Sequence, residues 1–112
     1  MIEETILTYL NSELTVPVYM EEPKKNPPEV YVVIEKTGSG KTNHIYSSTF
    51  ALKSYAKSLY EAARLNESVK KTMDNAITLG DICSSRLNSD YNFTDTTTKT
   101  YRYQAVYDLI HY

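Results

Sequence analysis

The hydrophobic positions at the start of the chain recur at helical spacing. Four apolar residues follow one another at steps of four, with a fifth beside them: Ile2, Ile6, Leu10 and Leu14, and Leu7. Such spacing places side chains on one face of a helix. The pattern therefore predicts a short helix over residues 2–14 that buries a single apolar stripe.

Two short β-branched runs come next. The first, residues 16–20, is interrupted by Pro17, and a proline inside such a run favours an edge strand. Residues 21–28 hold three of the four prolines and predict a loop. The second run, Val30–Ile34, is densely β-branched and predicts the clearest strand of the chain.

A polar segment, residues 38–43, separates that strand from the next. Its two glycines predict that the strand ends here and that a flexible hairpin turn follows. Residues 44–53 alternate loosely between apolar and polar side chains, which predicts an antiparallel return strand. The positions expected to face the core are Ile45, Thr49, Phe50 and Leu52.

From about residue 54 the apolar spacing changes to steps of three and four, as on one helical face. The positions concerned are Tyr55, Leu59, Ala62, Asn66, Val69, Met73 and Ala76. Ser58 and Glu61 fit a capping box, so the helix begins either at Ser54 or at Ser58. Gly80 is a natural C-terminal stop. This helix is the longest and is expected to lie across the sheet.

The last third of the chain predicts two strands joined by a threonine-rich turn at residues 94–100, which looks mobile. One face of the first strand holds Cys83, Ser85, Leu87, Ser89, Tyr91 and Phe93, and one face of the second holds Tyr101, Tyr103, Ala105, Tyr107 and Leu109. Cross-strand aromatic pairs specify a register. The expected pairs are Phe93 with Tyr101, Tyr91 with Tyr103, and Leu87 with Tyr107.

Together these elements predict a single α+β domain over residues 1–112. Two helices pack on a mainly antiparallel sheet of about five strands, in the order α-β-β-β-α-β-β. A chain of 112 residues with 41% hydrophobic and 23% charged residues supports one such domain. Eleven tyrosines against two phenylalanines and no tryptophan suit half-exposed sheet faces and protein interfaces.

Charge and cysteine content narrow the function classes. The net charge of −2 offers no basic footprint for nucleic-acid binding. Cys83 is the single cysteine, which excludes a disulfide framework and a thiolate metal cluster. The sequence shows no signal peptide and no apolar run that could span a bilayer. The expected protein is cytosolic, or part of a particle assembled in the cytosol.

One segment resembles a phosphate-binding loop. Residues 37–42 read Thr-Gly-Ser-Gly-Lys-Thr after a predicted strand, but Glu35 stands where the pattern requires its first glycine. A carboxylate at that point repels phosphate, and residues 43–49 do not open a helix. We therefore interpret the segment as a hairpin turn.

No other residues form a catalytic or metal-binding pattern. His44 and His111 are far apart and have no cysteine or carboxylate at ligand spacing, so both are expected to be strand residues. Cys83 is expected on the inward face of a strand, as a buried structural thiol and not a nucleophile. Thr96, Thr97 and Thr98 form an exposed, uncharged tip, which either becomes ordered against a partner or is only a tolerated loop.

The chain resembles a family of small tail-component proteins from long-tailed bacteriophages and prophages. This family includes tail terminators, also called tail completion proteins, and related head–tail joining proteins. The similarity covers nearly the whole chain and contains no catalytic motif, so its specificity comes from order and spacing. It is carried by Val16-Pro-Val-Tyr19, the strand Tyr31–Gly38, the segment Ser54–Ala62, and the ending Tyr101–Tyr107.

The resemblance implies a non-enzymatic ring subunit, commonly one of six, that caps the tail tube and joins it to the head. The implied partners are further copies of the chain, the major tail tube protein and head–tail connector proteins. Nucleic acid would enter only as DNA passing through the ring lumen, and no cofactor, metal or membrane is implied. The expected location is the bacterial cytoplasm during assembly and then the virion tail. Loops available to neighbours or tube would be Gly38, Ser39, Gly40, Lys41, Thr42 and Asn43, with Thr96, Thr97, Thr98 and Lys99.

Three alternatives stay open. Within the same particle, the chain would be a head-side joining protein or another minor tail protein. In a different class, it would be a small cytosolic ligand-binding or regulatory domain, with a concave pocket and no ring. The third is an enzyme that uses Cys83 or His44.

Overall fold

Five strands form one sheet, in the order β1-β2-β3-β5-β4, in the computed structural model of residues 1–112. The elements along the chain are α1 (Ile2–Glu13), β1 (Val18–Tyr19), β2 (Tyr31–Thr42), β3 (Ile45–Ala56), α2 (Leu59–Asp74), the 3-10 turn η1 (Ala76–Thr78), β4 (Ile82–Asn92) and β5 (Tyr101–His111). β1 runs parallel to β2, and the other three pairs are antiparallel. The predicted α+β class and the order α-β-β-β-α-β-β are confirmed.

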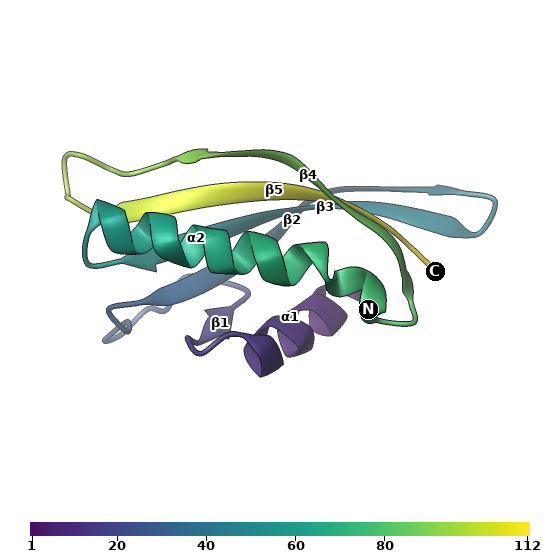
Figure 1. Cartoon of the computed structure of the whole chain (residues 1–112), viewed down its shortest axis with the longest axis horizontal. Coiled ribbons are helices and arrows are strands. Elements are labelled where there is room, and N and C mark those ends of the chain that lie inside the picture. Colours follow the sequence, from purple (N-terminus) through teal and green to yellow (C-terminus); the bar gives the residue numbers. More distant parts are fainter.

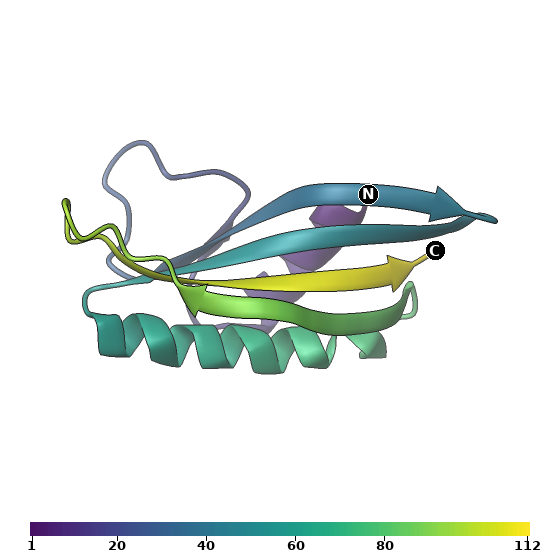
Figure 2. The ribbon, with the colours of Figure 1, turned by 90° about the horizontal axis from the view of Figure 1, so that it is seen from above.

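Both helices lie on the same side of the sheet (Figure 1). Seen from above, β2, β3, β5 and β4 lie side by side, and the opposite face of the sheet carries no helix (Figure 2). The molecule is elongated along the strands, with extents of 45 × 24 × 24 Å. Neither α1 nor α2 has the length and apolar composition that a bilayer-crossing helix requires.

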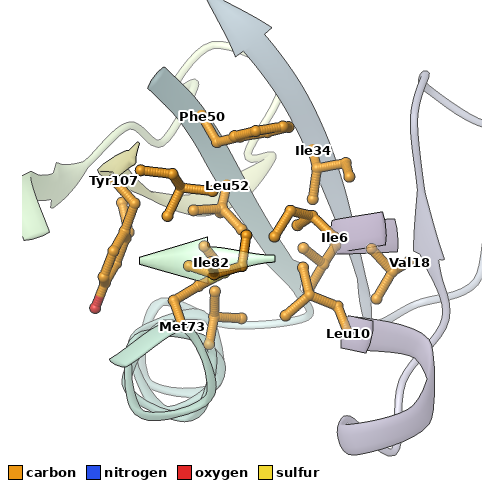
Figure 3. Packing of buried hydrophobic residues seen from close by; sticks show 13 residues of the cluster. Ile6, Leu10, Val18, Ile34, Phe50, Leu52, Met73, Ile82 and Tyr107 are labelled. Atoms are coloured by element: carbon orange, nitrogen blue, oxygen red, sulfur yellow. The ribbon is translucent and has the colours of Figure 1, made fainter. Parts of the chain in front are cut away.

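The main core fills the space between the helices and the sheet (Figure 3). Ile6 and Leu10 of α1 are fully buried, which confirms the apolar stripe predicted for the first helix. From the sheet, alternate residues of each strand point into this core, because side chains alternate between the two faces. The sheet residues of the core are Val18, Val32, Ile34, Phe50, Leu52, Ile82, Ala105, Tyr107 and Leu109.

The second helix begins at the later of the two predicted caps. The Ser58 hydroxyl accepts a hydrogen bond from the Glu61 backbone N–H at 3.2 Å, so the serine satisfies one of the free donors of the first turn. Tyr55, expected on the helical stripe, belongs to β3 instead. The helix ends at Asp74 and not near Gly80, since Asn75 caps it and η1 follows.

The register of the last hairpin departs from the prediction at a β-bulge. Leu87 lies opposite Tyr107 as expected, but the pairing shifts between Leu87 and Ser89. The inserted residue moves every later partner by one position, so Tyr91 lies opposite Gln104 and not Tyr103. The expected pairs of Tyr91 and Phe93 were therefore wrong, and both rings are partly exposed.

Candidate functional site

The segment from Gly38 to Thr42 is strand and not loop. β2 continues through both glycines and pairs with β3 as far as Thr42 opposite Ile45. The turn consists of Asn43 and His44 alone, with φ angles of 51° and 67°. Two positive φ values in a two-residue connection are the geometry that matches the twist of paired strands. The predicted flexible turn over residues 38–43 was therefore wrong except at its last residue, and His44 is a turn residue.

The expected core face of the return strand is only half right. Phe50 and Leu52 are fully buried, whereas Ile45 is 41% exposed. Thr49 points to the helix-free face, where its hydroxyl donates a hydrogen bond to Asp108 at 2.9 Å. Ile45 is exposed because the hairpin extends beyond both helices (Figure 1). Thr49 faces the other way because it alternates along the strand with buried Phe50.

The tip of the other hairpin is an ordered turn. Asp95 and Thr100 exchange two backbone hydrogen bonds of 3.0 Å, and the Asp95 carboxylate accepts from the backbone N–H groups of Thr97 at 3.0 Å and Thr98 at 3.4 Å. Those two N–H groups hold the pKa of Asp95 below its ordinary value. Lys99 closes the turn with a φ of 55°. Thr96, Thr97 and Thr98 are exposed, as expected, but their backbone is held in place.

The two hairpin tips lie at opposite ends of the long axis (Figures 1 and 2). Within one chain the structure therefore does not bring the predicted interface residues together. It places residues 38–43 at one end of the sheet and residues 96–99 at the other. A surface that uses both groups needs at least two molecules.

A hollow of about 580 Å³ lies beneath the β2–β3 end, on the helix side of the sheet. It is lined by residues from the start of α1, from the β2–β3 hairpin, from the position just before β4 and from the C-terminal end of β5. Lys36 pairs with Glu3 across it, with 3.2 Å between Nζ and Oε2. The Glu3 pKa is lowered, first by its own backbone N–H at the helix start and then by Lys36. Lys41 and Asp81 also line the hollow, and neither has an ion-pair partner.

A buried serine–histidine pair, one residue from β3 and one from β5, lines this hollow on the sheet side. Ser48 Oγ and His111 Nε2 are 2.8 Å apart, and both residues are at least 94% buried. Tyr46 stacks on the His111 ring at 5.6 Å, and Lys41 lies over Tyr46 at 5.2 Å. The other ring nitrogen of His111 faces the Tyr112 carbonyl and not a carboxylate, so the arrangement lacks the third member of a hydrolytic triad. We interpret the pair as a polar link between β3 and β5.

The structure also places the other residues that the sequence analysis considered as chemical sites. Cys83 is exposed and not buried as expected, because the pairing shifts between Ile82 and Ser84 and Ile82 takes the buried position. No group of three or more histidine, cysteine or acidic side chains gathers as a metal site. The segment that resembles a phosphate-binding loop is extended strand and leads into a turn, not a helix.

Sequence reasoning missed a second cluster, on the helix-free face near the other end of the sheet. Tyr31 and Tyr55 stack with their centroids 4.6 Å apart, and both hydroxyls donate to the Glu22 carboxylate. Arg102 donates to the Tyr55 hydroxyl at 3.3 Å and lies 4.4 Å from the centre of the Phe93 ring. Burial, and then the bond to Glu22, raise the pKa of Tyr55 to about 12. The signal available in the sequence was the alternation of Tyr31 with Val32, which places it opposite the core face.

No protein-family model matches the sequence, and no curated protein is significantly similar to it.

Proposed function

We propose that the protein is a structural subunit of a phage or prophage tail, a tail terminator that forms a ring on the tail tube and joins it to the head. The observation that carries the proposal is the uncovered end of the sheet. Along β2, only Val32 and Val33 have a neighbouring strand on the outer side, so the edge from Ile34 to Thr42 is free. A free edge of this length is a site for pairing with another chain.

The architecture supports the same proposal. Two helices on one face of a mainly antiparallel sheet, in the order α-β-β-β-α-β-β, is the arrangement that the family resemblance implies. A ring subunit needs two different surfaces, one for each neighbour, and this sheet has two different edges. A cap on a tube must also bind the last tube layer, and the exposed tip at residues 96–99 is available for that contact.

The test is binding to tail ends. Tail tubes assembled from the matching tube protein, mixed with this protein and viewed by electron microscopy, should carry a ring at one end and stop growing. A variant with Thr96→Ala, Thr97→Ala and Thr98→Ala keeps the backbone N–H groups that Asp95 accepts from, so it should keep its melting temperature and lose this binding. Tubes that grow without limit in the presence of the wild-type protein would contradict the proposal. Binding to filled heads and not to tubes would favour the head-side joining protein.

One observation favours a second candidate, a small ligand-binding domain. The hollow beneath the β2–β3 end, at about 580 Å³, falls in the size range of small-molecule sites. Mass in solution over a range of concentrations, measured by native mass spectrometry and light scattering, separates the two. A closed ring supports the tail subunit. A stable monomer or dimer that neither assembles nor binds tube ends supports the ligand-binding domain.

A further inference from the structure

The sheet has two free edges that run in opposite directions. β2–β3, β3–β5 and β5–β4 are three successive antiparallel pairs, so β4 runs opposite to β2. Rotating a copy of the molecule about an axis parallel to the strands preserves strand direction. β4 of one copy would then meet β2 of the next as an antiparallel pair, and the helices of both copies would lie on the same side of a continuous sheet.

The two edges also lie at the same height along the strands. The pairing places Gly38, Thr49, Asp108 and Arg86 in one row across the sheet. Lys41, Tyr46, His111 and Ile82 form a second row. The free part of β2 and residues Ile82–Asp90 of β4 are therefore level, and copies related by rotation alone can pair there. β1 does not interfere, because it contacts only Val32 and Val33.

The charges on the two edges are complementary on each face. On the helix-free face, Glu35 of β2 lies in the row of Ser89, so it would be diagonal to Arg86 of β4. On the helix side, Lys41 of β2 lies in the row of Ile82, next to Asp81, which immediately precedes β4. Arg86, Lys41 and Asp81 have no ion-pair partner within the chain, and Glu35 is paired only with Lys53 at 3.1 Å. Opposite charges at diagonal or adjacent positions across the two edges favour this contact.

Gly38 lies directly after a β-bulge in β2, where the pairing with β3 shifts between Lys36 and Gly38. A glycine inside a strand weakens it, and none of the glycines has a positive φ that would require one. A Cβ added at Gly38 would meet no atom within 4 Å. In the row that the two edges share, Gly38 lies opposite Arg86 of the neighbouring copy. The missing side chain then leaves room for the arginine on the helix-free face.

We infer that copies of this protein assemble by antiparallel pairing of the β2 edge, Ile34–Thr42, with the β4 edge of the next copy, with Gly38 opposite Arg86. The inference rests on the proposed function in so far as it supplies the contact between ring subunits. Because the two edges differ, each copy uses one edge toward each neighbour, and a closed ring leaves no edge unpaired.

The test is a directed cross-link in a Cys83→Ser background, which removes the only other thiol. Gly38→Cys and Arg86→Cys are made as separate proteins, mixed, and treated with an oxidant or a short thiol cross-linker. We expect a covalent dimer that contains one of each, and no dimer from either protein alone. Tyr60→Cys is the matched control: this α2 residue is 70% exposed and belongs to neither edge strand, so it should not cross-link to Gly38→Cys. Unchanged melting temperatures establish that the variants fold.

Two outcomes overturn the inference. Dimers from Gly38→Cys alone would mean that β2 pairs with β2. Absence of the mixed dimer at the highest soluble concentration, with folded variants, would mean that the two edges do not meet. The double variant Gly38→Cys/Arg86→Cys should give cross-linked products that stop at one closed size. Products without an upper size would contradict ring closure.

A charge exchange provides a second test without cysteines. Lys41→Asp and Asp81→Lys should each reduce the assembled fraction, and the double variant should restore it. No recovery in the double variant would contradict the proposed contact. The outcome is also separable from the tail proposal. Cross-linked rings that ignore tube ends would leave the edge contact standing and remove the tail function, whereas capped tubes without the cross-link would do the reverse.

Discussion

The two ends of the sheet, each closed by a polar turn, are stabilised in different ways. At the end that carries residues 94–100, the Tyr31–Tyr55 stack, Glu22 and Arg102 fix the strands, and Asp95 holds the turn. At the end that carries Asn43 and His44, the strands extend past the helices and leave Ile45 and Tyr46 about 40% exposed. The first end is stabilised within the chain, and the second leaves its backbone edge and charges free.

This difference indicates where the molecule is open to partners. A pair of bare strands is marginally stable in water unless something packs on it. On its helix side the β2–β3 end has the Ser48–His111 link, the Tyr46 stack with Lys41 over it, and the Lys36–Glu3 ion pair, and no buried aromatic pair. We therefore expect mutations at the two ends to separate stability from assembly.

The largest expected difference is between two tyrosines of β3. Tyr55 is 4% exposed and Tyr46 is 40% exposed. Tyr55→Ala removes a buried ring and should lower the free energy of unfolding by about 3–4 kcal/mol. Tyr46→Ala should cost less than about 1 kcal/mol. Denaturant unfolding of the two variants measures both, and equal losses would erase the distinction between the ends.

Alkaline pH should weaken the Tyr55 end selectively. The folded protein holds the Tyr55 proton more tightly than the unfolded chain, since the pKa rises from 10.0 to about 12. Its contribution is complete below pH 10 and is lost as the pH rises through 12, by at most about 2–3 kcal/mol. Tyr55→Phe should therefore flatten the fall in unfolding free energy over this range. An unchanged slope would show that the other buried tyrosines, Tyr31 and Tyr107, account for it.

A smaller loss of stability is expected from a mutation in the threonine-rich turn. Asp95→Ala removes the acceptor for two backbone N–H groups and should lower the melting temperature by a few degrees. Asp95→Asn, which keeps the acceptor oxygen, is the control and should recover most of the loss. Calorimetry of the two variants is sufficient. If Asp95→Ala melts like the wild type, the tip is not held by this carboxylate.

The smallest expected effect is a gain in stability from a mutation in the β2–β3 turn. His44 has a φ of 67°, a backbone conformation that costs most side chains energy and glycine little. His44→Gly should raise the free energy of unfolding by about 0.5–1 kcal/mol. Asn43→Gly should change it less, because asparagine tolerates this conformation. A loss of stability in His44→Gly would indicate that the imidazole makes a contact worth more than the backbone strain.

Most of the fold was predictable because helical spacing and β-branched runs are local signals. The stripe of Ile6 and Leu10, the Ser58 cap and the strand around Val32 needed no tertiary information. The errors arose where one inserted residue shifts the strand pairing of all the residues that follow it. A bulge after Leu87 turned Tyr91 away from its expected partner, and one after Ile82 exposed Cys83. Nothing in the local sequence marks these insertions.

The candidate interface was harder to predict for a related reason. Gly38 and Gly40 indicate a turn when only the chain itself is considered, yet β2 pairs through both of them. The free edge depends on β1 being two residues long, which Pro17 suggests but does not determine. The Ser48–His111 pair joins residues 63 positions apart, and no spacing rule connects them.

The brevity of β1 also sets the length of any contact that the molecule makes through β2. β1 occupies the outer side at Val32 and Val33, and the Val32 N–H is already donated to the Pro17 carbonyl at 3.0 Å. An incoming strand can therefore enter from the open end only as far as Ile34. β1 acts as a stop that fixes how far two partners slide past each other, so every contact of this kind would have the same overlap.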